Sequence, residues 1–112
     1  MSRKQRHTSY VDCPIEATLD LIGGKWKGSL MYRLSEQTRR FNELRRLFPK
    51  LSQRQLTNQL RELEADGLVH RKVYAVVPPK VEYSLTDRGR TMLPTLEALA
   101  RWGREHVLGE QA

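Results

Sequence analysis

The chain has 112 residues, which is the size of one ordinary domain and excludes a two-domain protein. Hydrophobic residues make up 38% and charged residues 29%, a composition typical of a globular chain with a modest core. Its net charge of +7, from 20 Lys and Arg against 13 Asp and Glu, favours a polyanionic partner, either nucleic acid or an anionic membrane surface.

The first residues and the cysteine content bear on the cellular compartment. Residues 1–10 are polar and basic without a hydrophobic stretch, and no apolar run is long enough to span a bilayer. Cys13 is the only cysteine, so it can form no internal disulfide and no cysteine-rich metal site. We therefore expect a cytoplasmic protein with no signal peptide and no membrane partner.

Two helices are predicted at the start of the domain. Pro14 is favoured at the first position of a helix, and Gly23-Gly24 ends that helix. A second helix is predicted over residues 25–35, because its apolar side chains recur on one face. These are Trp26, Leu30 and Leu34. We expect the aromatic rings on such stripes to lie in the core and not to stack on a ligand, namely Trp26, Phe41 and Phe48.

A short third helix is predicted from about Phe41 to Pro49, with Asn42 as a cap near its start. It lies in the most basic part of the chain, since residues 39–61 hold seven basic side chains and one acid, a net charge of +6. The basic residues are Arg39, Arg40, Arg45, Arg46, Lys50, Arg54 and Arg61. The remainder is close to neutral, so this segment is the first candidate for contact with a polyanion.

The clearest helix signal begins at Ser52. Ser52 and Gln55 form a capping box, in which the Ser hydroxyl accepts from the free amide of residue 55 and the Gln side chain reaches back. Leucines at 56, 60 and 63 form a buried stripe, and Asp66-Gly67 ends the helix. On a helix that turns about 100° per residue, three side chains suited to base edges and phosphates point away from that stripe. They are Arg54, Asn58 and Arg61.

A β-hairpin and a last helix follow. Residues 68–77 and 81–85 read as two strands joined by a tip that Pro78-Pro79 stiffens. Thr86 caps a last helix that carries several large apolar residues, and Pro94 should kink that helix or split it in two. Three helices, a short link to the helix that begins at Ser52, and a hairpin predict a winged helix-turn-helix, of class α+β and mainly α.

Several stretches together resemble the HxlR-type family of bacterial transcriptional regulators, winged helix-turn-helix proteins related to the MarR group. These are Cys13-Pro14, residues 21–27 (LIGGKWK), 40–45 (RFNELR), 52–57 (SQRQLT), 60–69 (LRELEADGLV), 77–86 (VPPKVEYSLT) and Trp102-Gly103. The resemblance extends from residue 13 to about residue 106. We therefore expect a basic arm over residues 1–12, the domain over 13–106 and a tail over 107–112.

The family resemblance implies a homodimer built from the first and last helices, which binds double-stranded DNA at an inverted-repeat operator. In that arrangement the helix that begins at Ser52 enters the major groove and the hairpin is the wing. We expect DNA contacts from Arg40, Lys50, Ser52, Gln53, Arg54, Thr57, Asn58, Arg61 and Lys80. Arg54 and Asn58 are the candidates for base contacts. The pair Arg71-Lys72 on the first hairpin strand could either contact DNA or remain a solvated surface pair.

The last helix is too apolar for an ordinary exposed face. No further element follows that could cover it, so we expect a dimer interface there rather than a monomer core, formed by Leu96, Leu99 and Trp102.

Cys13 is the one residue with candidate redox chemistry. It precedes Pro14, at a helix N-terminus whose free amide groups stabilise a thiolate, and the alternative is an inert capping residue. In several members of the family a cysteine at this position responds to oxidants or electrophiles. The effector, whether an oxidant or a small molecule, is not specified by the sequence.

No catalytic or metal-binding pattern is present. The three histidines are scattered, no paired carboxylates or phosphate-binding loops occur, and we expect no metal, no cofactor and no enzymatic activity. The sequence thus predicts a dimeric DNA-binding regulator, with repression the expected mode. The alternatives are a winged helix that binds protein and a non-specific nucleic-acid binder.

Overall fold

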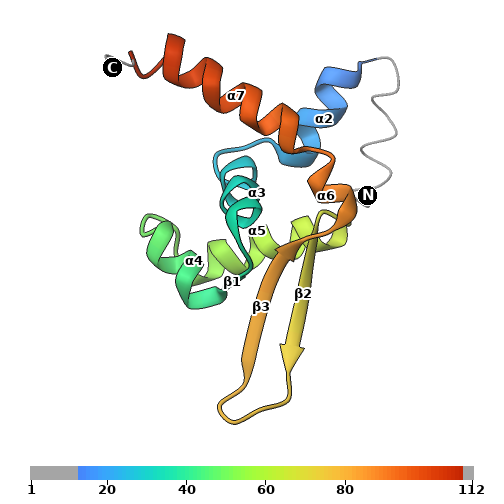
Figure 1. The fold of residues 1–112 in the computed structure, drawn as a ribbon, viewed down its shortest axis with the longest axis vertical. Coiled ribbons are helices and arrows are strands. Elements are labelled where there is room, and N and C mark those ends of the chain that lie inside the picture. The colour runs from blue at the N-terminus through green and yellow to red at the C-terminus, as the bar shows by residue number, and fades with distance from the viewer. Residues whose placement is uncertain (1–12, 110–112) are drawn as a thin grey trace.

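The computed structural model describes residues 13–109 of the chain. The expected arm over residues 1–12 lies outside this range, as do residues 110–112 of the tail. The elements in chain order are α2 (Pro14–Ile22), α3 (Lys27–Glu36), β1 (Arg39–Arg40), α4 (Phe41–Leu47), α5 (Gln53–Ala65), β2 (Val69–Tyr74), β3 (Lys80–Leu85), α6 (Asp87–Arg90) and α7 (Leu93–His106). Figure 1 shows this order from blue to red.

The first two helices form as expected, with one difference at their junction. Pro14 opens α2, and Gly24 adopts a left-handed backbone with φ of 77°, which an L side chain rarely tolerates. The second helix begins at Lys27 and not at Lys25. The reason is that the turn set by Gly24 uses the next two residues before helical hydrogen bonding starts, so that Leu30 is the first to donate, to the Trp26 carbonyl.

The predicted cap of the third helix is wrong. Asn42 is the second residue inside α4, and Arg40 is the residue that precedes the helix. Glu43 closes this end, because its Oε1 accepts from the backbone N–H of Arg40 at 2.7 Å. Arg40 is extended because it also belongs to β1, a two-residue strand that the sequence analysis did not predict.

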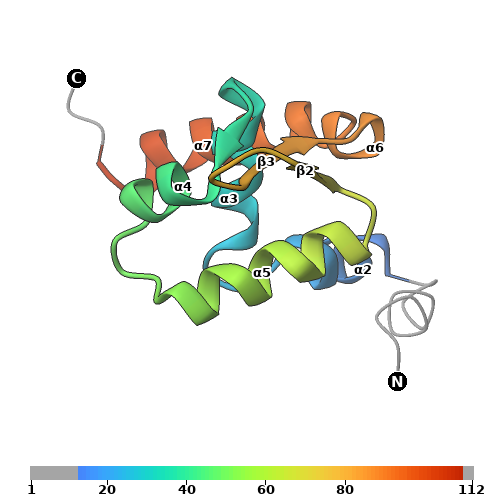
Figure 2. The same cartoon turned by 90° about the horizontal axis from the view of Figure 1, so that it is seen from below.

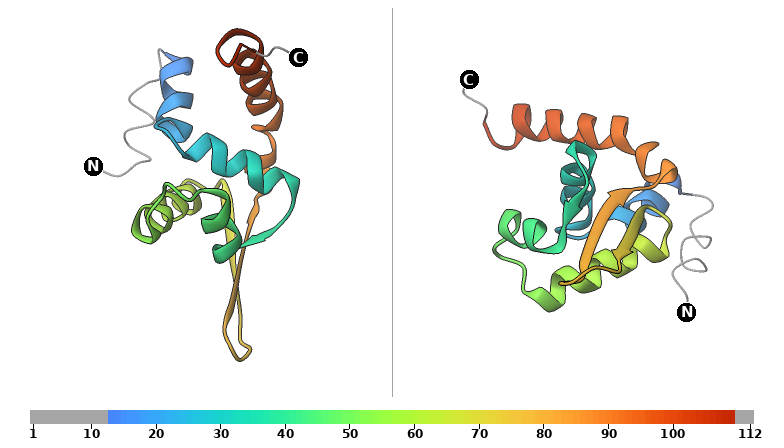
Figure 3. Two further views of the ribbon diagram at one scale, coloured as in Figure 1. Left: turned by 90° about the vertical axis from the view of Figure 1, so that its left-hand side faces the viewer. Right: turned by 60° about the horizontal axis from the view of Figure 1, so that its bottom comes forward.

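The sheet has three antiparallel strands in the order β1-β3-β2. In the hairpin, Arg71 lies opposite Tyr83, and Lys72 lies opposite Glu82. The strand β2 ends at Tyr74, earlier than the predicted residue 77, so the wing tip is longer than expected. Figure 3 shows the hairpin projecting beyond the helices, with α2 and α7 at the opposite end of the molecule.

The last helical region is split into α6 and α7 near Pro94, which is one of the two outcomes, a kink or a split, that the sequence predicts. Thr86 caps the short helix α6, and its Oγ1 accepts from the Gly89 N–H at 2.9 Å. Pro94 then occupies the first turn of α7, where its missing N–H costs nothing.

The core lies between α3, α4, α5 and the sheet. Its fully buried side chains come from these elements: Leu30, Met31, Leu44, Leu56, Leu60, Leu63 and Val69. Phe48 is buried, and Trp26 and Phe41 are half-buried against the same cluster, so all three predicted aromatic residues pack on the core. Seen from below in Figure 2, α5 lies along one side of the molecule, with its outer face away from this core.

Candidate nucleic-acid interface

The helix α5 begins as the sequence predicts. Ser52 Oγ accepts from the Gln55 N–H at 3.0 Å, and Gln55 Oε1 accepts from the Ser52 N–H at 2.9 Å. At the other end, Asp66 is the C-cap residue, and Gly67 after it adopts a left-handed backbone with φ of 76°. The reciprocal bonds fix the start of α5, so the side chains of its first two turns have defined directions.

The predicted recognition residues of α5 face solvent. The exposed ones are Ser52, Gln53, Arg54, Asn58 and Arg61, while Thr57 is half-buried. Thr57 Oγ1 donates to the Gln53 carbonyl at 2.8 Å. Within residues 13–109, the side chains of Arg54, Asn58 and Arg61 have no hydrogen-bond or ion-pair partner. Their donors are therefore available to an external ligand.

An ion pair that the sequence analysis missed connects α5 to α3. The Lys27 ammonium is buried and pairs with the half-exposed Glu62 carboxylate of α5. The sequence signal for this ion pair is a lysine on the same helix as the core residues Leu30, Met31 and Leu34. Because a buried ammonium strongly prefers a paired carboxylate, this contact restrains the rotation of α5 about its axis.

The basic segment continues from α5 onto α4. Arg40, Arg45, Arg46 and Lys50 are exposed, and the side chains of the last three have no hydrogen-bond or ion-pair partner among residues 13–109. The only acid of the segment, Glu43, is used by the backbone of Arg40. The charge therefore remains uncompensated over the surface of α4 and the loop that precedes α5, which is the arrangement expected for phosphate contacts.

On the wing, Lys80 belongs to a side-chain cluster centred on Tyr74. The ammonium groups of Lys80 and Lys72 lie 4.5 Å and 4.9 Å from the centroid of the Tyr74 ring. The Tyr74 hydroxyl donates to Glu82 Oε1 at 2.8 Å, and Lys80 Nζ lies 3.5 Å from Glu82 Oε2. That hydrogen bond, and then the charge of Lys80, lower the pKa of the Glu82 carboxyl below its ordinary value. Tyr74 and Glu82, which the sequence analysis did not select, thus orient Lys80.

The combined geometry, a capped helix with a polar outer face beside a hairpin, matches a known family. The family model described as HxlR-like helix-turn-helix covers residues 21–111. The chain belongs to the HxlR-like helix-turn-helix family. It is therefore a transcriptional regulator of the helix-turn-helix type.

Relatives of the HxlR-like domain agree in sequence and in structure. YdeP of Bacillus subtilis, an uncharacterized HTH-type transcriptional regulator, is 60% identical over 94 residues, which cover 84% of this chain and 73% of YdeP. The solved structure of the redox regulator HypR in its oxidized form has a TM-score of 0.81 at 60% identity, and the match covers 84% of this chain and 97% of that one. The reduced form of the regulator YodB from B. subtilis has a TM-score of 0.74 at 31% identity, covering 85% and 94%.

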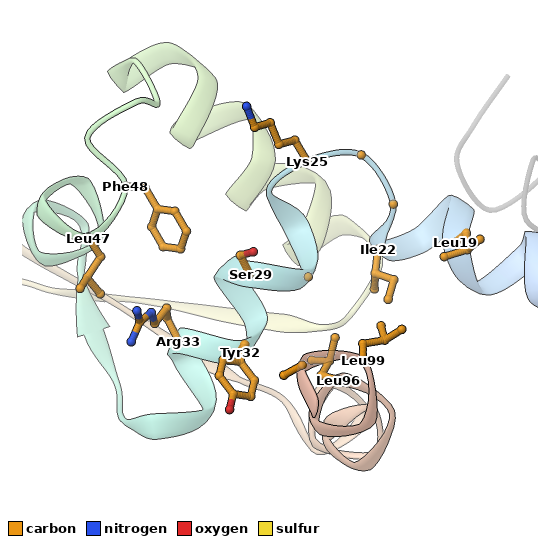
Figure 4. Close-up of a pocket in the computed structure, with 14 residues that line it drawn as sticks. Leu19, Ile22, Lys25, Ser29, Tyr32, Arg33, Leu47, Phe48, Leu96 and Leu99 are labelled. Atoms are coloured by element: carbon orange, nitrogen blue, oxygen red, sulfur yellow. The ribbon is translucent and has the colours of Figure 1, made fainter. Parts of the chain in front are cut away.

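The residues predicted for a dimer interface divide into two groups on the HxlR-like fold. Leu96 is only 5% exposed and belongs to the chain's own core, whereas Leu99 and Trp102 are 53% and 60% exposed. Figure 4 shows Leu96 and Leu99 of α7 beside Ile22, at the edge of a hollow of about 600 Å³ between α2, α3, α4 and α7. The apolar surface open to a partner therefore excludes Leu96.

Cys13 lies at the N-cap of α2, as predicted, and is half-buried. Its carbonyl accepts from the Ala17 N–H at 3.0 Å, but its side chain makes no capping hydrogen bond. In residues 13–109 no three metal-binding side chains lie together. In the same range no helix is both long enough and apolar enough to cross a membrane.

Proposed function

We propose that this HxlR-like regulator is a homodimer that binds a specific inverted-repeat DNA operator with α5 in the major groove. The observation that carries this proposal is the outer face of α5. On it Arg54, Asn58 and Arg61 are exposed and have no partner in the described chain. A guanidinium reads guanine and an amide reads adenine through paired hydrogen bonds, so Arg54 and Asn58 are the base-reading residues.

The remaining predicted contacts are assigned to the DNA backbone. Arg40, Lys50, Arg61 and Lys80 supply charge to phosphates, and Ser52, Gln53 and Thr57 supply polar groups near the start of α5. Phosphate contacts of this kind fix the register of the helix in the groove without reading sequence.

The homodimer is supported by the exposed apolar side chains of α7, Leu99 and Trp102. Further exposed apolar side chains occur on α2, at Ile15 and Leu19. Of these four, Leu19 and Leu99 line the same hollow, and soluble monomers rarely expose large contiguous apolar surface. A two-fold dimer would place its two copies of α5 in successive major grooves, with half-sites about 34–36 Å apart.

We further propose that the regulator is a repressor and that oxidation or alkylation of Cys13 releases it from DNA. The relatives HypR and YodB are a redox regulator and a protein solved after diamide treatment, which supports a redox role for this chain. In the reaction with diamide, two thiols are oxidised to one disulfide while diamide is reduced to the hydrazine. Since the chain has one cysteine, the second thiol comes from the partner copy or from a small thiol.

The proposed redox response is tested with Cys13→Ser. Diamide in the presence of a small thiol should weaken DNA binding by the unmodified protein and leave Cys13→Ser unaffected. Equal affinity of both proteins under diamide would reject Cys13 as the sensor and leave the DNA-binding proposal intact.

The central experiment is selection of DNA from a random pool by the full chain. We expect enrichment of an inverted repeat that survives competition with excess unrelated DNA. If unrelated DNA competes for the protein as well as the selected DNA does, the protein is a non-specific nucleic-acid binder. Failure to bind any DNA at low salt would favour a winged helix that binds protein.

A further inference from the structure

A second hollow, lined by polar residues, lies between α5 and the sheet and includes three of the α5 residues already expected to contact DNA: Gln53, Thr57 and Arg61. Its volume is about 390 Å³. Its lining comes from the first residue of α4, Phe41, from four residues of α5 and from one residue on each of the strands β2 and β3. The α5 and strand residues are Gln53, Thr57, Arg61, Glu64, Arg71 and Tyr83. Gln53, Arg61 and Arg71 are exposed, so the hollow opens to solvent on the side of α5 that faces the wing.

Tyr83 supplies an unusual group to this hollow. The residue is only 7% exposed, yet in the described part of the chain its hydroxyl has no hydrogen-bond partner. Leaving a buried hydroxyl unpaired costs free energy, and buried tyrosine hydroxyls usually bond to protein, water or ligand. By contrast, the hydroxyl of Tyr74, on the opposite face of the same hairpin, is paired with Glu82. The Tyr83 hydroxyl is therefore free to donate a hydrogen bond to an acceptor that binds in the hollow.

The charge of the lining indicates which acceptor fits. Arg71 lies directly opposite Tyr83 in the antiparallel register, so both side chains project from the same face of the sheet. Arg61 reaches the hollow from α5, and neither guanidinium has a partner within residues 13–109. Glu64 is the one carboxylate in the lining, so two positive charges face one negative charge. A singly charged anion with several acceptor oxygens satisfies both guanidinium groups and the hydroxyl.

We propose that this hollow binds one phosphate group of the DNA backbone, held by Arg61, Arg71 and the Tyr83 hydroxyl. The inference rests on the proposed DNA-binding function. It adds Arg71 and Tyr83 to the DNA-binding residues and places one phosphate between the recognition helix and the wing. The same chemistry would suit a free phosphate compound, so the experiment must separate the two sources.

The first test compares folding with DNA binding in Tyr83→Phe, which removes only the hydroxyl. Because that hydroxyl is unpaired in the free protein, the variant should unfold at the same or a slightly higher temperature, yet bind the selected DNA about tenfold more weakly. Tyr32→Phe, on α3 and away from the hollow, is the matched control and should bind as before. A destabilised Tyr83→Phe, or one with unchanged affinity for DNA, would overturn the role of the hydroxyl.

The second test uses the salt dependence of DNA binding. Arg71→Ala should bind about tenfold more weakly and reduce the slope of log affinity against log salt by about 1, whereas Tyr83→Phe should leave the slope unchanged because it removes no charge. Arg90→Ala, which removes an exposed charge from α6, is the control. An unchanged slope for Arg71→Ala overturns the phosphate contact.

The third test identifies the source of the phosphate. Phosphates of the selected DNA are replaced one at a time by uncharged methylphosphonates. At one position per half-site the substitution should weaken binding by the unmodified protein and have little further effect on Arg71→Ala. If the protein binds DNA but no position couples to Arg71, this inference fails while the proposed function stands. Displacement of DNA by micromolar inorganic phosphate, lost in Arg71→Ala, would assign the hollow to a free ligand instead.

Discussion

Two exposed surfaces of the molecule differ in charge and in hydrophobicity. The surface of α4, α5 and the loop between them carries several arginines and Lys50, which have no partner within residues 13–109, whereas the surface of α7 and α2 exposes leucine, isoleucine and tryptophan. The charged surface gains by neutralising a polyanion and releasing its counterions. The apolar surface gains by excluding water against another apolar surface, which salt does not screen. The proposed DNA-binding and dimer interfaces thus depend on different physical forces and should respond differently to salt.

The largest expected effect is that of salt, which should weaken DNA binding but not dimerisation. If the charged surface neutralises about six to ten phosphates per dimer, raising salt from 50 to 200 mM should weaken DNA binding by about 10³–10⁵-fold. The dimer should persist over the same range, because its surface is apolar. Fluorescence anisotropy with labelled DNA and sedimentation velocity measure the two quantities on the same samples. A flat response of DNA binding to salt would contradict the assignment of the charged surface.

The reverse perturbation is Trp102→Ala on α7. Loss of this half-exposed ring should weaken dimerisation and thereby reduce affinity for a two-half-site DNA by about 10²-fold or more, since the two copies of α5 no longer bind as one unit. Affinity for a single half-site should not change. Arg101→Ala, an exposed neighbour on the same helix, is the control. A monomeric unmodified protein at micromolar concentration would contradict this prediction.

A smaller effect is expected within the charged surface, from Arg54→Ala compared with Lys50→Ala. Loss of a paired contact to a base edge should cost about 1–3 kcal/mol and relax the preference at one position in each half-site. Lys50→Ala should weaken binding to all DNA sequences about equally. Affinities for a panel of single-base operator variants measure both. An unchanged base preference in Arg54→Ala would exclude Arg54 as a base-reading residue.

The smallest effect concerns the carboxylate of the wing. The pKa of Glu82 is lowered in the folded protein, chiefly by the Tyr74 hydrogen bond, so its ionised form stabilises the fold. This contribution is complete above the ordinary pKa of a glutamate and is lost as the pH falls through the lower folded value. Tyr74→Phe should raise the Glu82 pKa toward its ordinary value. Carboxyl resonances followed by NMR during an acid titration would show an unchanged midpoint if Tyr74 is not the cause.

The sequence predicted those features that depend on residues close together in the chain. The Ser52–Gln55 cap and the division at Pro94 follow from local rules, and both are present. The strand β1 could not be predicted, because two residues become a strand only by pairing with Tyr83 and Glu82 about forty positions later. The predicted Asn42 cap failed because that same pairing extends Arg40 and moves the start of the helix.

The candidate site divides in the same way. The outer residues of α5 were predicted from helical periodicity, whereas the hollow beside Arg71 requires the sheet register and the position of α5 against it. An unpaired hydroxyl is a property of its surroundings and leaves no pattern in the sequence. Leu96 was misplaced for a related reason, because periodicity shows that a helix face is apolar but not which chain covers it.

The contact between the buried Lys27 ammonium and the Glu62 carboxylate limits how the sequence of α5 can change. Glu62 lies one residue after Arg61, on the same helix that must change its outer residues to read a different operator. Replacing Glu62 alone would leave the buried Lys27 ammonium without this carboxylate, so position 62 should change only together with position 27. New DNA specificities could then arise by exchange of the outer residues, while the orientation of the helix is inherited unchanged.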